Sequence, residues 1–296
     1  MPNPVRTAIF PVAGMGTRFL PATKATPKEL LPVIDKPLIQ FAIEEAQSAG
    51  IERFIFVSHP TKSAIQRHVM DDAGLRASLT AKGKFKIAED LQRAALKPDA
   101  DDVIFEMQHE PLGLGHAVLC AKKHVLPGPV AVLLPDDLIL GRNCLQEMIG
   151  AYRANEAGHM VASMRVSHQE TQNYGILSVT RTDGRLSFAD NVVEKPKPEH
   201  APSQNAVVGR YILDGSIFDD LENQQAGTGG EIQLTDAIDR SAGRVGLSGF
   251  RFSGTRFDCG SKAGMLRATI HRASQDAECC NVLKEVLTAE PSVQAA

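Results

Sequence analysis

The sequence has few of the features that mark several large classes of protein. Its 296 residues include no tryptophan, and aromatic residues make up 5% of the chain. No apolar run approaches the roughly 20 residues that a membrane-spanning helix requires. Residues 1–6 do not combine a basic region with a long apolar stretch, so the sequence predicts no secretory signal. We therefore expect a cytoplasmic protein that neither spans nor binds a membrane.

Positive charge is also scarce, because 32 lysines and arginines stand against 35 acidic residues, for a net charge of −3. Nonspecific nucleic-acid binding depends on net positive charge, and single-strand binding depends on aromatic side chains that stack on bases. The composition thus disfavours a nucleic-acid-binding module. The five cysteines contain no C-x-x-C pair, and a disulfide framework is not expected in a chain of this length.

In the first half of the chain, apolar runs alternate with helical patterns. Strands are predicted at 5–12, 54–57, 103–107 and 130–134, with helices over 37–49, 62–70 and 116–123. Continuously apolar strands separated by helices indicate a parallel sheet that is covered on both faces.

The second half has strand patterns separated mainly by short turns, at 160–166, 175–180, 191–194 and 206–213. Helices are predicted over 217–221, 231–240, 263–277 and 281–287. The expected fold is α/β, with a Rossmann-like, mostly parallel central sheet flanked by helices, a smaller mixed or antiparallel portion and C-terminal helices. We predict a single domain over 1–288, in two parts that meet near 158, and a frayed tail over 289–296.

The loop after the first strand is the most informative segment of the chain. Gly14 and Gly16 let backbone N–H groups approach a ligand closely. Arg18 offers a forked donor for phosphate oxygens, and Lys28 adds a mobile positive charge. Neither G-x-x-x-x-G-K-[ST] nor G-x-G-x-x-G fits, because Phe19 stands where the latter needs its third glycine. The loop therefore predicts a phosphate site of another kind.

Carboxylates follow the apolar strand that ends near residue 134. Asp136 and Asp137 lie where ligands bind in open α/β sheets, outside the carboxyl ends of the strands. Carboxylate oxygens are ligands that Mg²⁺ prefers, so a metal site is one interpretation, and helix capping or solvation is the other. Asp258, distant in sequence, has the same two interpretations, because it could cap a helix that begins near Ser261.

The run from Gly14 to Pro32, GMGTRFLPATKATPKELLP, resembles the signature of bacterial sugar nucleotidyltransferases, and most closely that of the UDP-glucose pyrophosphorylases among them. The resemblance extends to about Ala277 and includes the Glu194-Lys195-Pro196 segment and the run GEIQLTD over 230–236. It implies a Mg²⁺-dependent reaction of UTP with glucose 1-phosphate. It also implies a homodimer or homotetramer, with the C-terminal helices as candidate interface.

The resemblance implies a role for each matching residue. Nucleotide contacts are expected from Ala13, Gly14, Gly16, Thr17, Glu29, Gln108 and Gly113, where the amide of Gln108 suits the imide edge of uracil. Sugar-phosphate contacts are expected from Gly175, Glu194, Lys195 and Glu231, although Glu231 also suits the first turn of a helix. Asp136 and Asp258 would hold Mg²⁺, with Asp137 as the substitute for Asp136. The groups expected to carry catalysis are Arg18, Lys28, Asp136 and Lys195.

Two alternative functions remain open at this point. A thymidylyltransferase or cytidylyltransferase of the same fold would share most of these residues, although Glu29 after Lys28 favours the uridylyl branch. A catalytically silent regulatory paralogue is disfavoured because the charged residues are present. His116 is expected to face the neighbouring loop rather than to act in catalysis.

Overall fold

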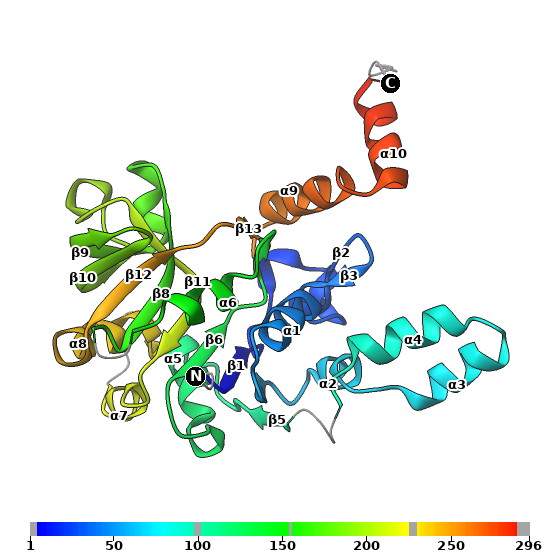
Figure 1. Cartoon of the computed structure of the whole chain (residues 1–296), viewed down its shortest axis with the longest axis horizontal. Coiled ribbons are helices and arrows are strands. Elements are labelled where there is room, and N and C mark those ends of the chain that lie inside the picture. Colours follow the sequence, from blue (N-terminus) through cyan, green and yellow to red (C-terminus); the bar gives the residue numbers. More distant parts are fainter. Residues whose placement is uncertain (1–4, 98–101, 154–155, 225–229, 289–296) are drawn as a thin grey trace.

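A nine-stranded mixed sheet runs through the computed structural model (Figure 1), which describes residues 5–97, 102–153, 156–224 and 230–288. The strand order is β5-β4-β1-β6-β11-β8-β12-β10-β9. The predicted tail, 289–296, lies outside the described residues. No helix in the described part of the chain is long and apolar enough to cross a membrane.

The first four strands in this order are parallel, as the sequence predicts. They are β5 (Asp102–Met107), β4 (Arg53–Ser58), β1 (Thr7–Pro11) and β6 (Val130–Leu133). The chain moves from β1 through β4 to β5 on one side and then returns to place β6 on the other side of β1. The helices α1 (Leu38–Ser48), α2 (Ser63–Val69) and α5 (Leu114–Cys120) lie between these strands in sequence. The order of strands therefore reverses between β1 and β6, which is where open α/β sheets bind their ligands.

The second half extends the same sheet instead of building a separate one. The strand β11 (Asn205–Leu213) pairs antiparallel with both β6 and β8 (His159–Arg165), and β12 (Leu247–Arg251) lies parallel to β8. The hairpin of β9 (Gly175–Asp183) and β10 (Leu186–Glu194) closes the far edge. The helices α7 (Ile217–Glu222) and α8 (Leu234–Val245) follow β11. The predicted division near 158 thus falls within one continuous sheet.

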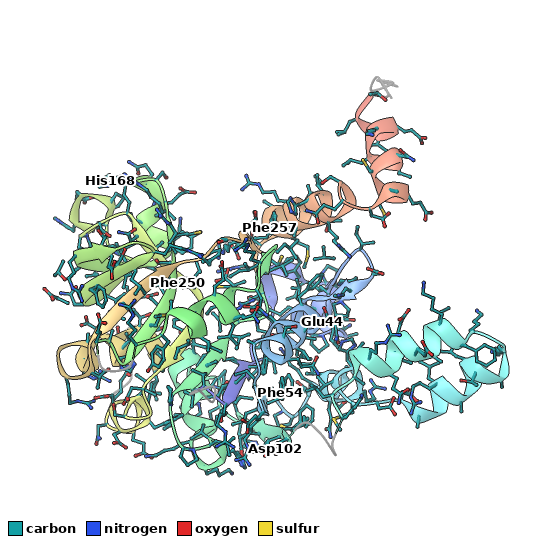
Figure 2. The ribbon with its side chains drawn as sticks, viewed as in Figure 1. Glu44, Phe54, Asp102, His168, Phe250 and Phe257 are labelled. Carbon is teal, nitrogen blue, oxygen red and sulfur yellow. The ribbon has the colours of Figure 1, made fainter. Side chains whose placement is uncertain are left out.

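A shared core joins the two halves. Phe54 and Phe250, labelled in Figure 2, lie far apart along the sheet but belong to one cluster of buried side chains. Phe10 of β1 is in that cluster and stacks on Phe56 with ring centroids 4.8 Å apart. Its neighbour Ile9 belongs to a second cluster, because successive residues of a strand face opposite sides. Both faces of the sheet are therefore covered, and the two halves are packed as one unit.

Several elements were not predicted from the sequence. A helical hairpin of α3 (Ala73–Ala81) and α4 (Phe85–Ala94) projects from the sheet (Figure 1). The helix α6 (Cys144–Ala151) covers part of the sheet. Two small ribbons pair β2 (Pro32–Val33) with β3 (Lys36–Pro37) and β7 (Asp137–Leu140) with β13 (Thr255–Asp258). Short 3₁₀ helices are η1 (Thr17–Phe19), η2 (Ala22–Lys24), η3 (Lys28–Leu30), η4 (Lys122–His124), η5 (Gln169–Asn173) and η6 (Pro198–His200).

The chain continues from β13 into α9 (Lys262–Ala273) and α10 (Ala277–Thr288), which extend away from the sheet (Figure 1). Exposed apolar side chains on these two helices are Leu266, Ile270, Val282, Val286 and Leu287. The homodimer or homotetramer expected from the sequence, with these helices at the interface, stays a prediction.

Candidate active site

Two cavities meet at the point where the strand order reverses. One, which we call the loop cavity, has a volume of about 450 Å³ and is lined by Gly14, Lys28, Gln108, Gly113 and Asp136 among others. The other, the strand cavity, has a volume of about 630 Å³ and is lined by Arg18, Gly175, Glu194, Lys195, Arg256 and Asp258 among others. Leu114 lines both, so the two cavities adjoin.

Contacts within the glycine-rich loop fix its conformation. Gly16 has φ 65°, a left-handed conformation in which a side chain is strained. A Cβ at Gly16 would also lie 3.0 Å from Cβ of Lys28. Thr23 donates its hydroxyl to the carbonyl of Gly16 at 2.8 Å. The glycine is therefore required by the fold of the loop, which holds Lys28 at its centre.

Lys62, which was not predicted as a site residue, binds the backbone of this loop and stabilises it. Its Nζ donates to the carbonyls of Val12 and Gly14 at 2.7 and 2.5 Å and to Oε2 of Glu29 at 2.9 Å. Glu29 is 1% exposed, so its carboxylate supports the loop and lines neither cavity. Burial raises the pKa of Glu29 and lowers the pKa of Lys62, although each charge opposes the shift of the other.

Lys28 and Asp136 form an ion pair in the wall of the loop cavity. Lys28 Nζ donates to Asp136 Oδ2 at 2.5 Å, and both side chains are about a quarter exposed. Burial acts against both charges, but their mutual attraction outweighs it, so the pKa of Lys28 is raised and that of Asp136 is lowered. Both groups are therefore charged near neutral pH and face the cavity with opposite signs.

Asp136, Asp258 and Arg18 converge around Gly260. A Cβ at Gly260 would lie 3.1 Å from Oδ1 of Asp258, 3.2 Å from Oδ2 of Asp136 and 3.7 Å from Nη1 of Arg18. Arg18 also donates to the carbonyl of Gly260 at 3.4 Å. The cap of α9 is Ser261, whose hydroxyl accepts from the backbone of Gly264, so Asp258 is not the helix cap that the sequence left open. The two carboxylates face the same small space.

The two carboxylates suit a hard divalent cation that is only partly held by protein ligands. Among the residues that the structure describes, no group of three or more His, Cys, Asp or Glu side chains gathers to hold a metal. Mg²⁺ is commonly held by one or two carboxylates, with substrate phosphates and water completing its shell. A pair of carboxylates where two larger cavities adjoin matches that pattern.

Asp137, the substitute metal ligand of the sequence analysis, has a structural role. Its carboxylate binds the guanidinium of Arg256 and accepts from the backbone N–H of Gly209 at 2.6 Å. It is 9% exposed, and burial raises its pKa. Because both of its oxygens are engaged by the protein, Asp136 remains the candidate at this position.

Gln108 and Gly113 lie together at the end of β5, in the wall of the loop cavity. Gln108 Nε2 donates to the carbonyl of Gly113 at 3.1 Å and lies 3.0 Å from Nδ1 of His116. Gly113 has φ 96°, and a Cβ there would come within 2.9 Å of Glu231 Cβ. From the sequence we expect Gln108 to offer the base both a donor and an acceptor. In the structure, however, the amide NH₂ group contacts Gly113 and His116 within the protein.

The strand cavity contains the Glu194-Lys195 pair at the end of β10. Lys195 Nζ pairs with Oε1 of Glu194 at 3.3 Å, and the Lys195 side chain is 61% exposed, so its charge is accessible to a ligand. The φ of Lys195 is 45°, an unusual conformation for a residue with a side chain, and it turns the chain at the end of the strand. Its backbone N–H donates to the carbonyl of Tyr174 at 3.0 Å. A Cβ at Gly175 would lie 3.3 Å from Oε2 of Glu194, so this glycine borders the same cavity.

Glu231 lies before α8 and outside its first turn, because the helix begins at Leu234. It lines the loop cavity, whereas Gln233 and Thr235 of the same segment line the strand cavity. Its carboxylate accepts from Nε2 of Gln233 at 2.8 Å. The segment is anchored by Ile232, whose backbone N–H donates to the carbonyl of Leu112 at 2.7 Å. Gly229, the residue before this motif, lies outside the described residues.

The remaining predicted nucleotide contacts lie on the glycine-rich loop. Ala13 and Gly14 line the loop cavity, and Thr17 lines a third cavity of about 430 Å³, which Ala13 also lines. The predicted residues therefore lie together at one edge of the sheet. Glu29 is the exception among them because it is buried under the glycine-rich loop and lines neither the loop cavity nor the strand cavity. Sequence reasoning missed Lys62 and Arg256, neither of which lies in a motif.

Comparison with known proteins gives a consistent result. Residues 8–274 match the family described as nucleotidyl transferase. A UTP–glucose-1-phosphate uridylyltransferase of Bacillus subtilis is 43% identical over 275 residues, which make up 93% of each chain. Among solved structures, a UTP-bound UGPase from Acinetobacter baumannii is 37% identical with a TM-score of 0.87, covering 97% of this chain and 100% of its own. A UDP-glucose pyrophosphorylase complexed with UDP-glucose is 33% identical with a TM-score of 0.82, covering 92% and 100%. The resemblance found in the sequence is thus confirmed.

Proposed function

The chain belongs to the nucleotidyl transferase family, and on that basis we propose that it transfers the uridylyl group of UTP to glucose 1-phosphate, giving UDP-glucose and pyrophosphate. One observation carries the proposal. Two adjoining cavities, each with its own cationic side chain, meet at the paired carboxylates of Asp136 and Asp258. Such an arrangement suits a reaction that joins two polyanions.

UTP occupies the loop cavity in this proposal. The backbone of Ala13 and Gly14, which line this cavity, approaches the phosphates, and Lys28 lies where it can neutralise the triphosphate and the departing pyrophosphate. Gln108 and Gly113 at the opposite wall contact the uracil ring. Glu29 contributes indirectly, through Lys62, by holding the loop in the conformation that the phosphates require.

Glucose 1-phosphate occupies the strand cavity. Lys195 binds the phosphate, and Glu194 with the backbone of Gly175 binds sugar hydroxyls. Gln233 and Thr235, which also line this cavity, offer further polar groups to the sugar. Glu231 lies at the wall of the loop cavity, beside Gly113, so it contacts the sugar only at the junction of the two cavities.

The chemistry needs no protein nucleophile. The phosphate oxygen of glucose 1-phosphate attacks the α-phosphorus of UTP in line with the departing pyrophosphate. The P–O bond to the sugar phosphate forms as the P–O bond to pyrophosphate breaks. The protein holds the two reactants in line and neutralises negative charge, and Arg18, beside Gly260, can reach the α-phosphate of the transferred uridylyl group.

Asp136 and Asp258 would hold Mg²⁺ together with the substrate phosphates. When bound, the cation supplies charge neutralisation for the phosphates that approach each other. Asp136 is suited to this role because Lys28 keeps the pKa of its carboxyl low, so that it stays ionised. Lys28 would in turn be free to move from Asp136 toward the triphosphate, since its stem is flexible.

The test is pyrophosphate release by the purified protein with Mg²⁺, glucose 1-phosphate and each of UTP, dTTP, CTP, ATP and GTP. Release with UTP well above the other four supports the proposal. Preference for dTTP or CTP would retain the reaction type and refute the nucleotide. No release with any of the five, from protein shown to be folded, would refute the activity and favour a binding or regulatory protein.

A further inference from the structure

His116 stands outside the roles proposed so far, although its ring touches the glutamine assigned to the base. It is the third residue of α5, and its Nδ1 lies 3.0 Å from Nε2 of Gln108. On the other side of the ring, Nε2 lies 3.9 Å from Sγ of Cys120, one helical turn away. The ring is therefore held between the base-binding glutamine and a cysteine of its own helix.

The orientation of the Gln108 amide follows from chemistry at two contacts. The carbonyl of Gly113 can only accept, so the amide atom 3.1 Å from it must be the NH₂ group. That group has two hydrogens, and the second points at Nδ1 of His116. His116 accepts there only as a neutral ring with its hydrogen on Nε2. Nε2–H then faces the sulfur of Cys120, whose thiol is kept protonated because burial raises its pKa.

With both hydrogens used, Gln108 has only Oε1 left for a ligand. Gln108 is 4% exposed and lines the loop cavity, and no described hydrogen bond in the structure reaches its Oε1. An acceptor at this place suits a base that carries an N–H on its pairing edge. Uracil offers N3–H there, whereas N3 of cytosine carries a lone pair that an acceptor repels.

We propose that His116 is a positioning residue that fixes the Gln108 amide with Oε1 toward the base, and thereby sets the preference for an imide-bearing pyrimidine over cytosine. Flipping the amide would place Oε1 against the carbonyl of Gly113 and would require His116 to move its hydrogen from Nε2 to Nδ1, so both contacts favour the observed orientation. This inference deepens the proposed function and rests on it for the identity of the base. His116 acts through Gln108 and does not touch the reacting phosphates.

The experiment compares wild type with three single variants. His116→Leu removes the acceptor at Nδ1. His116→Asn restores it, because Oδ1 of asparagine occupies nearly the same position as Nδ1 of histidine. Cys120→Ala removes the contact on the far side of the ring and is the matched control. Thermal unfolding of each variant reports whether the fold is intact, and affinities for UTP and CTP are measured by titration calorimetry alongside kcat and KM for pyrophosphate release.

For His116→Leu we expect the preference for UTP over CTP to fall roughly tenfold, because a donor of the amide loses its partner and the amide can turn. The loss should lie mainly in Kd and KM for UTP, with kcat at saturation little changed. His116→Asn and Cys120→Ala should stay within about threefold of wild type. Equal losses in the Leu and Asn variants, or an unchanged preference in the Leu variant, would overturn the inference.

The two readouts separate this inference from the proposed function. If wild type binds UTP more tightly than CTP but releases no pyrophosphate, the proposed transferase activity fails, and the calorimetric comparison still decides the role of His116. If wild type turns over UTP and the variants keep its nucleotide preference, the role of His116 fails alone. A wild type that binds CTP as tightly as UTP would overturn the inference directly.

Discussion

The buried pair of Lys62 and Glu29 yields the most quantitative prediction. Lys62 Nζ makes three hydrogen bonds, to two loop carbonyls and to Glu29, and the two side chains are 10% and 1% exposed. Lys62→Met retains most of the apolar stem but leaves the carboxylate alone, with Oε1 already lacking a partner among the described residues. Removing one partner of a buried pair costs about 3–5 kcal/mol of unfolding free energy.

The loss should depend on pH. Burial raises the pKa of Glu29, and Lys62→Met removes the larger of the two lysine charges that oppose this shift and leaves Lys28, so the carboxyl of the folded variant takes up a proton above the pKa of about 4.3 that it has when unfolded. A group with a raised folded pKa favours folding at low pH and loses that contribution as pH rises through its folded pKa. The destabilisation should therefore be smaller at pH 5 than at pH 7.

Urea unfolding followed by circular dichroism at the two pH values measures both effects. The double variant Lys62→Met/Glu29→Gln should recover much of the loss at pH 7 and lose the added pH dependence. Arg93→Met is the matched control, because its pair with Glu89 is exposed and should contribute well under 1 kcal/mol. A loss below about 1 kcal/mol for Lys62→Met at pH 7, or no recovery in the double variant, would refute the reasoning.

Three further predictions concern other buried or catalytic groups. Arg210 is 1% exposed and binds Glu45 at 2.8 Å, so Arg210→Met should lower the free energy of unfolding by about 3–5 kcal/mol in urea titrations, and adding Glu45→Leu should restore much of it. Burial lowers the pKa of His159 to about 4, so stability should fall by roughly 3 kcal/mol as pH drops from about 6.5 toward 4, and His159→Gln should remove this slope. Lys195→Ala should leave the melting temperature unchanged, because the side chain is 61% exposed, while kcat/KM for glucose 1-phosphate falls about 100-fold or more. Near-wild-type turnover would show that Lys195 does not bind the attacking phosphate.

The order of strands and helices around the site could be predicted because the local patterns agree with the final packing. Residues 130–134 are all apolar, and β6 is buried on both faces between β1 and β11. The helical stripe over 37–49 likewise became α1, with Leu38, Ile39, Ala42, Ile43 and Ala46 buried. Where the spacing of apolar residues matches the residues that are buried, the sequence predicts the helix or strand correctly.

The elements that were missed have weak burial signals or depend on distant partners. The helix α3 has no buried residue, and α4 buries only Ala88 although its sequence is amphipathic, so neither helix packs into the core. The strand β12 contains Gly249, where a Cβ would lie 2.4 Å from a methyl of Leu177. That close approach explains the glycine, but it is visible only once β12 is placed in the sheet.

The candidate active site likewise contains residues that could be predicted from the sequence and residues that could not. Gly16 and Lys28 could be predicted because they belong to the loop motif that follows β1, and Asp136 could be predicted because it lies just after β6. Lys62 and Arg256 could not, because their partners come from other parts of the chain. The distinction between Asp136 and Asp137 also required the structure, since it depends on which of two adjacent carboxylates Arg256 binds.

The central claim is that the two substrates react directly where the loop cavity and the strand cavity meet. The stereochemical course at the α-phosphorus tests it, with UTP carrying a single sulfur of known configuration on that phosphorus and glucose 1-phosphate as acceptor. One in-line displacement inverts the configuration, so the account predicts UDP-glucose analogue of inverted configuration. Retention would indicate two displacements through a covalent enzyme intermediate and would contradict the account.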